Sequence, residues 1–156
     1  MTPQTHFNTP MDKPVLHIPG ELLTPADEEL VETARTVLLR HYRPFWHMVS
    51  AALRGRDGRI WTGIHLGATV GRMQVCAEAV ALGRAVLEGD ARIDCAVAVR
   101  HPKTHELDQS LAVVAPCGAC REMLVDFDAD AMVIVPTGSG LIKVPVRTLL
   151  PIPYQR

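Results

Sequence analysis

The sequence has no run of about 20 apolar residues, so it contains no candidate for a membrane-spanning helix. Its 16 Lys and Arg residues are interspersed with 17 Asp and Glu residues, and no basic run is present that could follow a phosphate backbone. The N-terminus lacks the basic start and the apolar stretch of a secretion signal. We therefore expect a cytoplasmic protein whose partners include neither nucleic acid nor a membrane.

Cysteine is scarce, with four residues in a chain of 156. Without a secretion signal, so few thiols are more typical of metal binding in a reducing compartment than of disulfides. The length fits one domain, and a hydrophobic content of 47% is enough for a core. Because prolines recur through residues 1–20, we expect an extended N-terminal arm there and a single domain over residues 21–156.

Three of the cysteines form a pattern that predicts a metal site. Cys117 and Cys120 are three residues apart, so on a helix they share one face and can hold one ion. Cys76 can complete the set from the start of a second helix. Three protein ligands on zinc leave a fourth position for water, which is typical of a catalytic site, and Glu78 is placed to move protons to and from that water. The alternative is a structural four-cysteine site that includes Cys95, but Cys95 lies within an apolar stretch typical of a buried strand.

Hydrophobic periodicity predicts alternating strands and helices. Thr24 is the predicted N-cap of the first helix, with Asp27 three residues later, and this helix ends before Pro44. The predicted strands span residues 47–53, 59–66, 93–99, 131–135 and 141–144, and further helices span residues 75–87 and begin at Cys117. This order favours an α/β fold, a three-layer αβα sandwich with a mixed five-stranded sheet, in which an antiparallel hairpin is followed by largely parallel pairing.

The helix predicted over residues 75–87 is apolar on nearly every side, so we expect it to be buried. Gly83 within it is unfavourable for a helix by about 1 kcal/mol relative to Ala, which suggests the close approach of another backbone.

Cys76-Ala77-Glu78 and the segment from Pro116 to Cys120 resemble the zinc-binding segments of the small cytidine deaminase family, which uses Cys as the first ligand. Residues 49–53, 57–63 and 149–151 resemble other elements of that family, so the resemblance covers roughly residues 24–151. It implies a cytidine deaminase-like fold and one zinc per chain, held by Cys76, Cys117 and Cys120, with Glu78 as the catalytic proton carrier. It also implies a homotetramer, with a dimer as the alternative.

By the same resemblance, the reaction is hydrolytic deamination of a cytosine-like nucleoside or base with release of ammonia. The family's ribose-binding Asn-x-Glu pair is matched by His65 and Gly67, which do not reproduce its sugar contacts, so we expect a weaker preference for ribose. The alternative substrates are a blasticidin S-like antibiotic, as in the related blasticidin S deaminases, or a modified base. Polynucleotide editing and a non-catalytic zinc module are less favoured, because the charge is balanced and Glu78 is present.

Five residues are predicted to contact the substrate: His65, His47, Trp46, Ala77 and Pro116. The alternatives are a strand cap for His65 and core packing or a subunit contact for Trp46. Arg121 is predicted to donate hydrogen bonds to a thiolate, with a solvated surface charge as the alternative. The polar segment 100–110 predicts a solvated loop, with a lid over the substrate as the alternative.

Overall fold

The computed structural model describes residues 18–89 and 91–155, so most of the predicted arm over residues 1–20 lies outside the described residues. The chain forms these elements in order: α1 (Pro25–His41), β1 (Val49–Gly55), β2 (Ile60–Ile64), η1 (Gly71–Met73), α2 (Ala77–Glu88), β3 (Ile93–Arg100), β4 (Ala112–Val114), α3 (Gly118–Phe127), β5 (Met132–Thr137), β6 (Gly140–Pro145) and η2 (Val146–Leu149). In the described part of the chain, no helix is long and apolar enough to cross a membrane.

The sheet has the strand order β2-β1-β3-β5-β6, and the short strand β4 pairs with the C-terminal part of β3. The predicted mixed sheet is confirmed, with β4 as an additional strand. The prediction of largely parallel pairing is wrong, because β3 and β5 form the one parallel pair among the described strands. The helical crossover between β2 and β3 makes these two strands run in the same direction, but they are not paired with each other. Strand β1 lies between them and is antiparallel to both. A tight hairpin likewise makes β6 antiparallel to β5.

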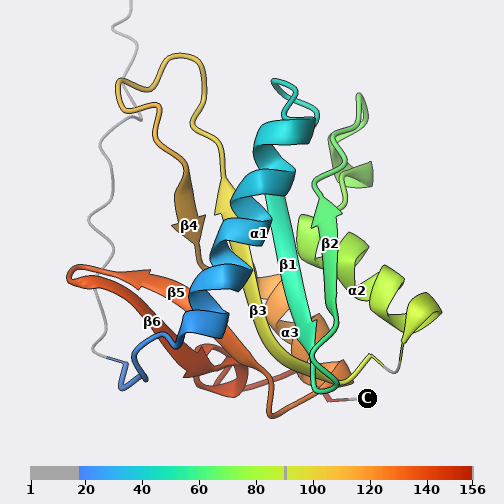
Figure 1. The fold of residues 1–156 in the computed structure, drawn as a ribbon. Helices are drawn as coiled ribbons and strands as arrows, with labels where there is room; N and C mark the ends of the chain where they lie inside the picture. The colour runs from blue at the N-terminus through green and yellow to red at the C-terminus, as the bar shows by residue number, and fades with distance from the viewer. Residues whose placement is uncertain (1–17, 90, 156) are drawn as a thin grey trace, which may run out of the picture.

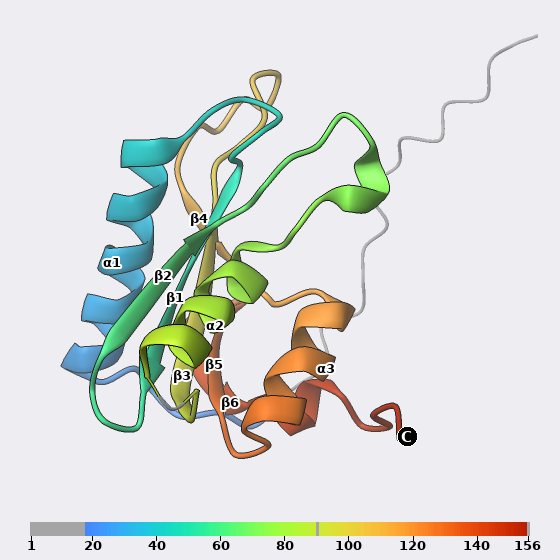
Figure 2. The ribbon, with the colours of Figure 1, turned by 90° about the vertical axis from the view of Figure 1, so that its right-hand side faces the viewer.

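Helices cover both faces of the sheet, which confirms the predicted three layers. Helix α1 packs on one face, and α2 and α3 pack on the other (Figures 1 and 2). Each interface has its own hydrophobic core. Trp61 on β2 is 2% exposed and belongs to the core beneath α2 and α3.

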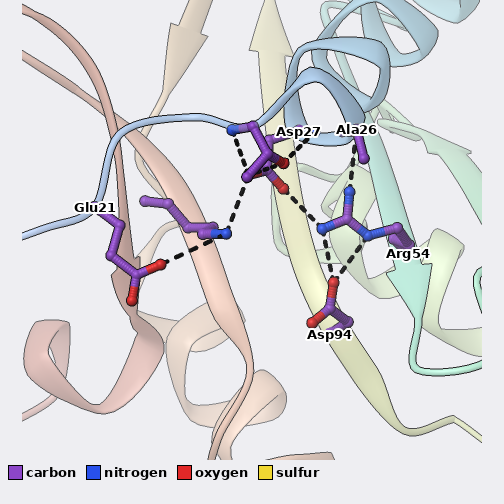
Figure 3. A network of polar contacts seen from close by, with 7 residues as sticks. Glu21, Ala26, Asp27, Arg54 and Asp94 are labelled. Carbon is purple, nitrogen blue, oxygen red and sulfur yellow. Dashed lines mark hydrogen bonds and ion pairs between the residues drawn. The ribbon is translucent and has the colours of Figure 1, made fainter.

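The first helix begins at a capping box that also anchors it to the sheet. The Asp27 carboxylate accepts hydrogen bonds from the Thr24 backbone N–H and hydroxyl, while Thr24 Oγ1 accepts one from the Asp27 N–H. Asp27 is fully buried, and its carboxylate binds Arg54 of β1 at 2.7 Å and Lys143 of β6 at 3.0 Å. Arg54 also binds Asp94 of β3, so one carboxylate ties α1 to the sheet (Figure 3). Burial raises the pKa of Asp27, but the hydrogen bonds from Thr24, Arg54 and Lys143 outweigh it and hold that pKa well below its usual range.

The surroundings of helix α2 differ from those predicted, since the helix is not buried on every side. One side of it is exposed in the single chain, with Val86 48% and Leu87 87% accessible. Within the single chain, no close approach is found at Gly83, since an added Cβ there would meet nothing within 4 Å. The sequence pattern showed that nearly every side of the helix is apolar, but not which of these sides a single chain covers.

The close backbone approach is instead at Gly63 on β2. A Cβ atom at Gly63 would collide with the backbone of Ala77 and Ala81 in α2. The absence of a side chain at Gly63 therefore lets the first turns of α2 lie directly against the sheet. This contact places the start of α2, where Cys76 and Glu78 lie, close to the end of β2.

Candidate metal centre

Two cysteines lie at the starts of two helices on the same face of the sheet. Cys76 is the N-cap residue of α2 and Cys117 is the N-cap residue of α3. Both cysteines therefore lie at helix starts, as predicted. Cys120 lies in the first turn of α3. The Cys76 and Cys117 sulfurs are 3.7 Å apart, and those of Cys117 and Cys120 are 3.4 Å apart. All three Sγ atoms lie within 4.8 Å of one another.

This spacing fits zinc. Tetrahedral Zn²⁺ with Zn–S bonds of about 2.3 Å separates its sulfur ligands by about 3.8 Å. Within residues 18–89 and 91–155, no other His, Cys, Asp or Glu joins the group. Cys95 is fully buried in the core beneath α1, on the opposite face of the sheet, and its burial raises its thiol pKa to about 12. The four-cysteine alternative is therefore wrong, and three sulfur ligands leave one position open on a tetrahedral ion.

The thiols need a cation to be ionised together. Burial raises the pKa of Cys76 and of Cys120 above the ordinary thiol value, and the nearby Glu78 carboxylate raises both further. Burial also acts to raise the pKa of Cys117, but the hydrogen bonds to its sulfur, led by the Cys120 backbone N–H, lower it overall. Only Cys117 is thus predisposed to be a thiolate. A divalent cation would supply the charge that stabilises all three thiolates.

Glu78 lies in the first turn of α2 and is 6% exposed. It is two residues from Cys76 in the chain, and its charge raises the pKa of the Cys76 and Cys120 thiols. Together with Pro116, it also borders a small internal space between the sheet and α3. A buried carboxylate beside a metal site is suited to holding a proton and passing it on, because little water competes for that proton.

Arg121 follows Cys120 directly, but its hydrogen bonds go to backbone rather than to sulfur. Its Nε donates to the Pro116 carbonyl at 2.8 Å, and its Nη1 donates to the Leu149 carbonyl at 3.1 Å. The predicted hydrogen bond to a thiolate is not among those that Arg121 forms with the described residues. The side chain instead connects the segment before Cys117 to the end of η2.

A cavity near these elements has a volume of about 480 Å³. It is lined by Tyr42, Pro44, Phe45, Met48, His65, Gln74, Lys103, Thr104 and His105. Of the five predicted substrate contacts, this lining includes His65. Sequence reasoning missed Tyr42, Met48 and Gln74, because their residue types and spacing do not indicate a binding site. Lys103, Thr104 and His105 lie in the polar segment 100–110, for which a lid over the substrate was the alternative prediction.

The other predicted contacts have different surroundings. A carbonyl can only accept a hydrogen bond, so His47 Nδ1 donates to the His65 carbonyl at 2.8 Å. Trp46 is 38% exposed, and the Arg43 guanidinium lies 5.2 Å from the centroid of its ring. Ala77 is buried beneath Gly63.

Gly67 stands where the family has the Glu of its Asn-x-Glu pair, and it packs against the turn that precedes β1. Its N–H donates to the Trp46 carbonyl at 2.7 Å. A Cβ atom at Gly67 would lie 2.5 Å from the Phe45 carbonyl oxygen and 2.7 Å from the Trp46 Cα. The backbone around Gly67 therefore leaves no room for a side chain at this position.

Comparisons with known proteins support the assignment of these cysteines to a zinc site. Residues 24–136 match the family model described as the cytidine and deoxycytidylate deaminase zinc-binding region. The chain is 42% identical over 130 residues to blasticidin-S deaminase of Bacillus cereus, covering 83% of this chain and 93% of that protein. It is 30% identical over 127 residues to cytidine deaminase of Sporosarcina psychrophila, covering 80% of this chain and 88% of that protein.

Solved structures show the same fold. Cytidine deaminase from Burkholderia pseudomallei matches with a TM-score of 0.66 at 25% identity, over 85% of this chain and all of that one (100%). Cytidine deaminase from Bacillus anthracis matches with a TM-score of 0.68 at 21% identity, over 81% of this chain and 88% of that one. The three converging cysteines, the fold and these matches together show that the chain belongs to the cytidine and deoxycytidylate deaminase family and is a zinc-dependent hydrolytic deaminase.

Proposed function

We propose that Cys76, Cys117 and Cys120 hold one zinc ion per chain and that Glu78 is the catalytic acid and base. The reaction replaces the amino group of a cytosine-like ring by oxygen and releases ammonia. The observation that supports these roles is the convergence of three sulfur atoms beside one buried carboxylate. When bound at these sulfurs, zinc supplies a Lewis acid that can lower the pKa of water from 15.7 to about 7.

Glu78 carries the protons of the reaction. As the water oxygen bonds to the amino-bearing ring carbon, the carboxylate accepts a proton from the water and donates it to the adjacent ring nitrogen. The second water proton then passes through the same carboxylate to the amine, whose carbon–nitrogen bond breaks to release ammonia. Each proton that Glu78 accepts is passed on, so the residue ends the cycle ionised. Proton transfer by one positioned group accounts for about 10²- to 10⁴-fold in rate.

Neighbouring residues position the site. Arg121 fixes the Pro116 carbonyl and thereby the start of α3, where Cys117 lies. Ala77 lets the first turn of α2 approach β2 at Gly63. We assign the substrate contact to His65, which lines the large cavity, while His47 holds the His65 backbone. Trp46 belongs to the turn that packs against Gly67, at the side of the same cavity.

For the substrate, we favour a blasticidin S-like nucleoside over cytidine. The 42% identity to a blasticidin-S deaminase supports this choice, as does the backbone packing that excludes a side chain at Gly67. Cytidine remains the second candidate, supported by the 30% identity to a cytidine deaminase. A base without a sugar would leave much of the 480 Å³ cavity empty.

We further propose a cytoplasmic homotetramer. The exposed Val86 and Leu87 on α2 are apolar side chains that a second chain could cover. The absence of a membrane-spanning helix from the described residues is compatible with this location.

Ammonia release from a substrate panel tests the proposed function. The zinc-loaded chain should deaminate blasticidin S with a higher kcat/KM than cytidine, and both more efficiently than free cytosine. Higher efficiency with cytidine would contradict the substrate choice, and no ammonia from any of the three would contradict the proposed function.

A further inference from the structure

The three cysteines of the metal centre differ in their exposure to solvent. Cys120 is 2% exposed and Cys76 is partly buried, whereas Cys117 is exposed. The two residues between Cys117 and Cys120 are exposed as well, and an added Cβ at Gly118 would meet nothing within 4 Å. A small reagent dissolved in water therefore reaches the Cys117 sulfur more easily than the other two sulfurs.

Two sulfur atoms lie close to that of Cys117. The Cys120 sulfur is 3.4 Å away and the Cys76 sulfur is 3.7 Å away, and all three cysteines are free. The sulfurs of a disulfide are about 2.05 Å apart. A bond between Cys117 and Cys120 therefore requires these two sulfurs to approach by about 1.4 Å.

The backbone of α3 favours Cys120 as the partner of Cys117. The Cys120 backbone N–H donates to the Cys117 sulfur at 3.4 Å, so the Cys117 side chain already turns toward the first turn of its own helix. Because both residues belong to one helix start, side-chain rotation can close the bond without moving one element against another. Two cysteines separated by two residues at a helix start are a common arrangement of reactive dithiols.

Tertiary contacts hold Cys76 away from Cys117. The start of α2 is fixed on the sheet, where Gly63 lies directly against the backbone of Ala77. The segment before α3 is fixed by the hydrogen bond from Arg121 to the Pro116 carbonyl. Helices α2 and α3 are separate elements on this face of the sheet (Figure 2), so a disulfide between their starts would have to displace one of them.

We propose that Cys117 is a site of oxidation by hydroperoxides and that Cys120 converts the oxidised sulfur into a disulfide. With hydrogen peroxide, the Cys117 sulfur bonds to one oxygen as the O–O bond breaks, which gives a sulfenic acid, and the thiol proton leaves with the other oxygen as water. The Cys120 sulfur then bonds to the Cys117 sulfur as the S–O bond breaks, and a second water leaves. In sum, two thiols are oxidised to one disulfide and one peroxide is reduced to two waters.

This disulfide is incompatible with the metal site. It occupies two of the three sulfurs that fit zinc, and Cys76 alone cannot complete a ligand set. A thiol reductant restores both thiols by thiol–disulfide exchange, and with them the site. The inference goes beyond the proposed function, since it holds for any substrate that the metal centre acts on.

The experiment treats the zinc-loaded chain with hydrogen peroxide, follows zinc release with a chromogenic indicator, and then alkylates the denatured protein and digests it with trypsin. Cleavage after Lys and Arg separates the cysteines into three peptides, with Cys76 in residues 73–84, Cys95 in residues 93–100, and both Cys117 and Cys120 in residues 104–121. We expect the last peptide to lose two hydrogen atoms and to take up no alkylating reagent. The other two should be alkylated, and one zinc should be released for each disulfide.

Three results would overturn the proposal. A cross-link between peptides 73–84 and 104–121 would show that Cys76, not Cys120, is the partner. Zinc retained with every thiol intact would show that Cys117 is not a site of oxidation. Zinc released with every thiol intact would exclude the disulfide as the cause. Ammonia release by the untreated chain tests the proposed function separately, because none of these results involves a substrate.

A matched pair of variants tests which sulfur the peroxide oxidises. Cys120→Ser and Cys117→Ser each lack one metal ligand, and each keeps one sulfur of the pair. Treated with peroxide and dimedone, which traps sulfenic acids, Cys120→Ser should be labelled at Cys117. The label should be lost in Cys117→Ser, because Cys120 is buried. Equal labelling of the two variants would overturn Cys117 as the oxidised site. Cys95 is the control for folding, since it should resist alkylation until the protein is denatured.

Discussion

Cys76 and Cys117 lie 41 residues apart in the chain, and their sulfur atoms are 3.7 Å apart in the structure. The contact exists because each residue caps a helix and both helices pack on the same face of the sheet. Two helix N-termini, with their partial positive charge, are thereby directed at one cluster of thiols. This arrangement lowers the electrostatic cost of three negative ligands before any ion is bound.

The cysteine assignment predicts a clear contrast in zinc content. Wild type should hold one zinc per chain, and Cys120→Ser should lose most of it, because two sulfurs cannot complete the ligand set. Cys95→Ala should retain the zinc, since Cys95 lies in the core beneath α1. Elemental analysis after dialysis measures both, and zinc loss from Cys95→Ala alone would contradict the assignment.

Gly67→Ala should disturb the turn before β1. The new Cβ would meet the backbone of Phe45 and Trp46, so the backbone must shift, at a cost of about 1–3 kcal/mol. Gly71→Ala is the matched control in the same connection, where an added Cβ meets nothing within 4 Å. Urea unfolding and the KM for the best substrate should change in the first variant and stay near wild type in the second. Equal effects from both would refute the packing argument.

Asp27→Ala should be strongly destabilising, by about 3–5 kcal/mol, because it leaves two cations near a buried site without their carboxylate. Asp94→Ala, in which the lost carboxylate is 43% exposed, should cost less than about 1 kcal/mol. Unfolding in urea at neutral pH measures both changes.

The same carboxylate predicts a pH dependence. The pKa of Asp27 is lower in the folded state than its ordinary value of 3.8, so its contribution is fully present above that value. As the pH falls below 3.8, the unfolded state binds the proton first and the contribution is progressively lost. The stability difference between wild type and Asp27→Ala should therefore shrink on acidification, and a constant difference from pH 7 to 3 would be inconsistent with this.

Arg121→Met should weaken zinc binding without removing a ligand. The loss of the hydrogen bonds to Pro116 and Leu149 frees the segment before Cys117, and such supporting contacts are typically worth about 10- to 100-fold in metal affinity. Arg147→Met, which breaks contacts to residues 129 and 130, is the control. Competition with a zinc chelator measures the affinities, and an unchanged affinity in Arg121→Met would exclude the positioning role.

Local signals in the sequence predicted much of this fold. The Thr24–Asp27 capping box and the cysteines at two helix starts depend on neighbouring residues, and the predicted strands and helices lie within two residues of the observed ones at nearly every end. Strand directions were predicted less well, because the placement of β1 between β2 and β3 is a tertiary property.

The same distinction applies to the site. The metal ligands were visible as a motif, whereas the cavity wall at Lys103 depends on how the segment after β3 folds back toward α1. Gly63 and Gly83 show most clearly what could not be predicted from the sequence alone. Both are glycines in apolar segments, but only the packing of α2 on β2 determines that the close approach is at Gly63.

The most direct test is Glu78→Gln, with zinc content and kcat measured on the same preparation. Glu88→Gln, at the exposed far end of α2, is the matched control. The expected result for Glu78→Gln is one zinc per chain with kcat lowered by about 10²- to 10⁴-fold, and near wild-type values for the control. Full zinc occupancy with wild-type kcat in Glu78→Gln would contradict the role of this carboxylate.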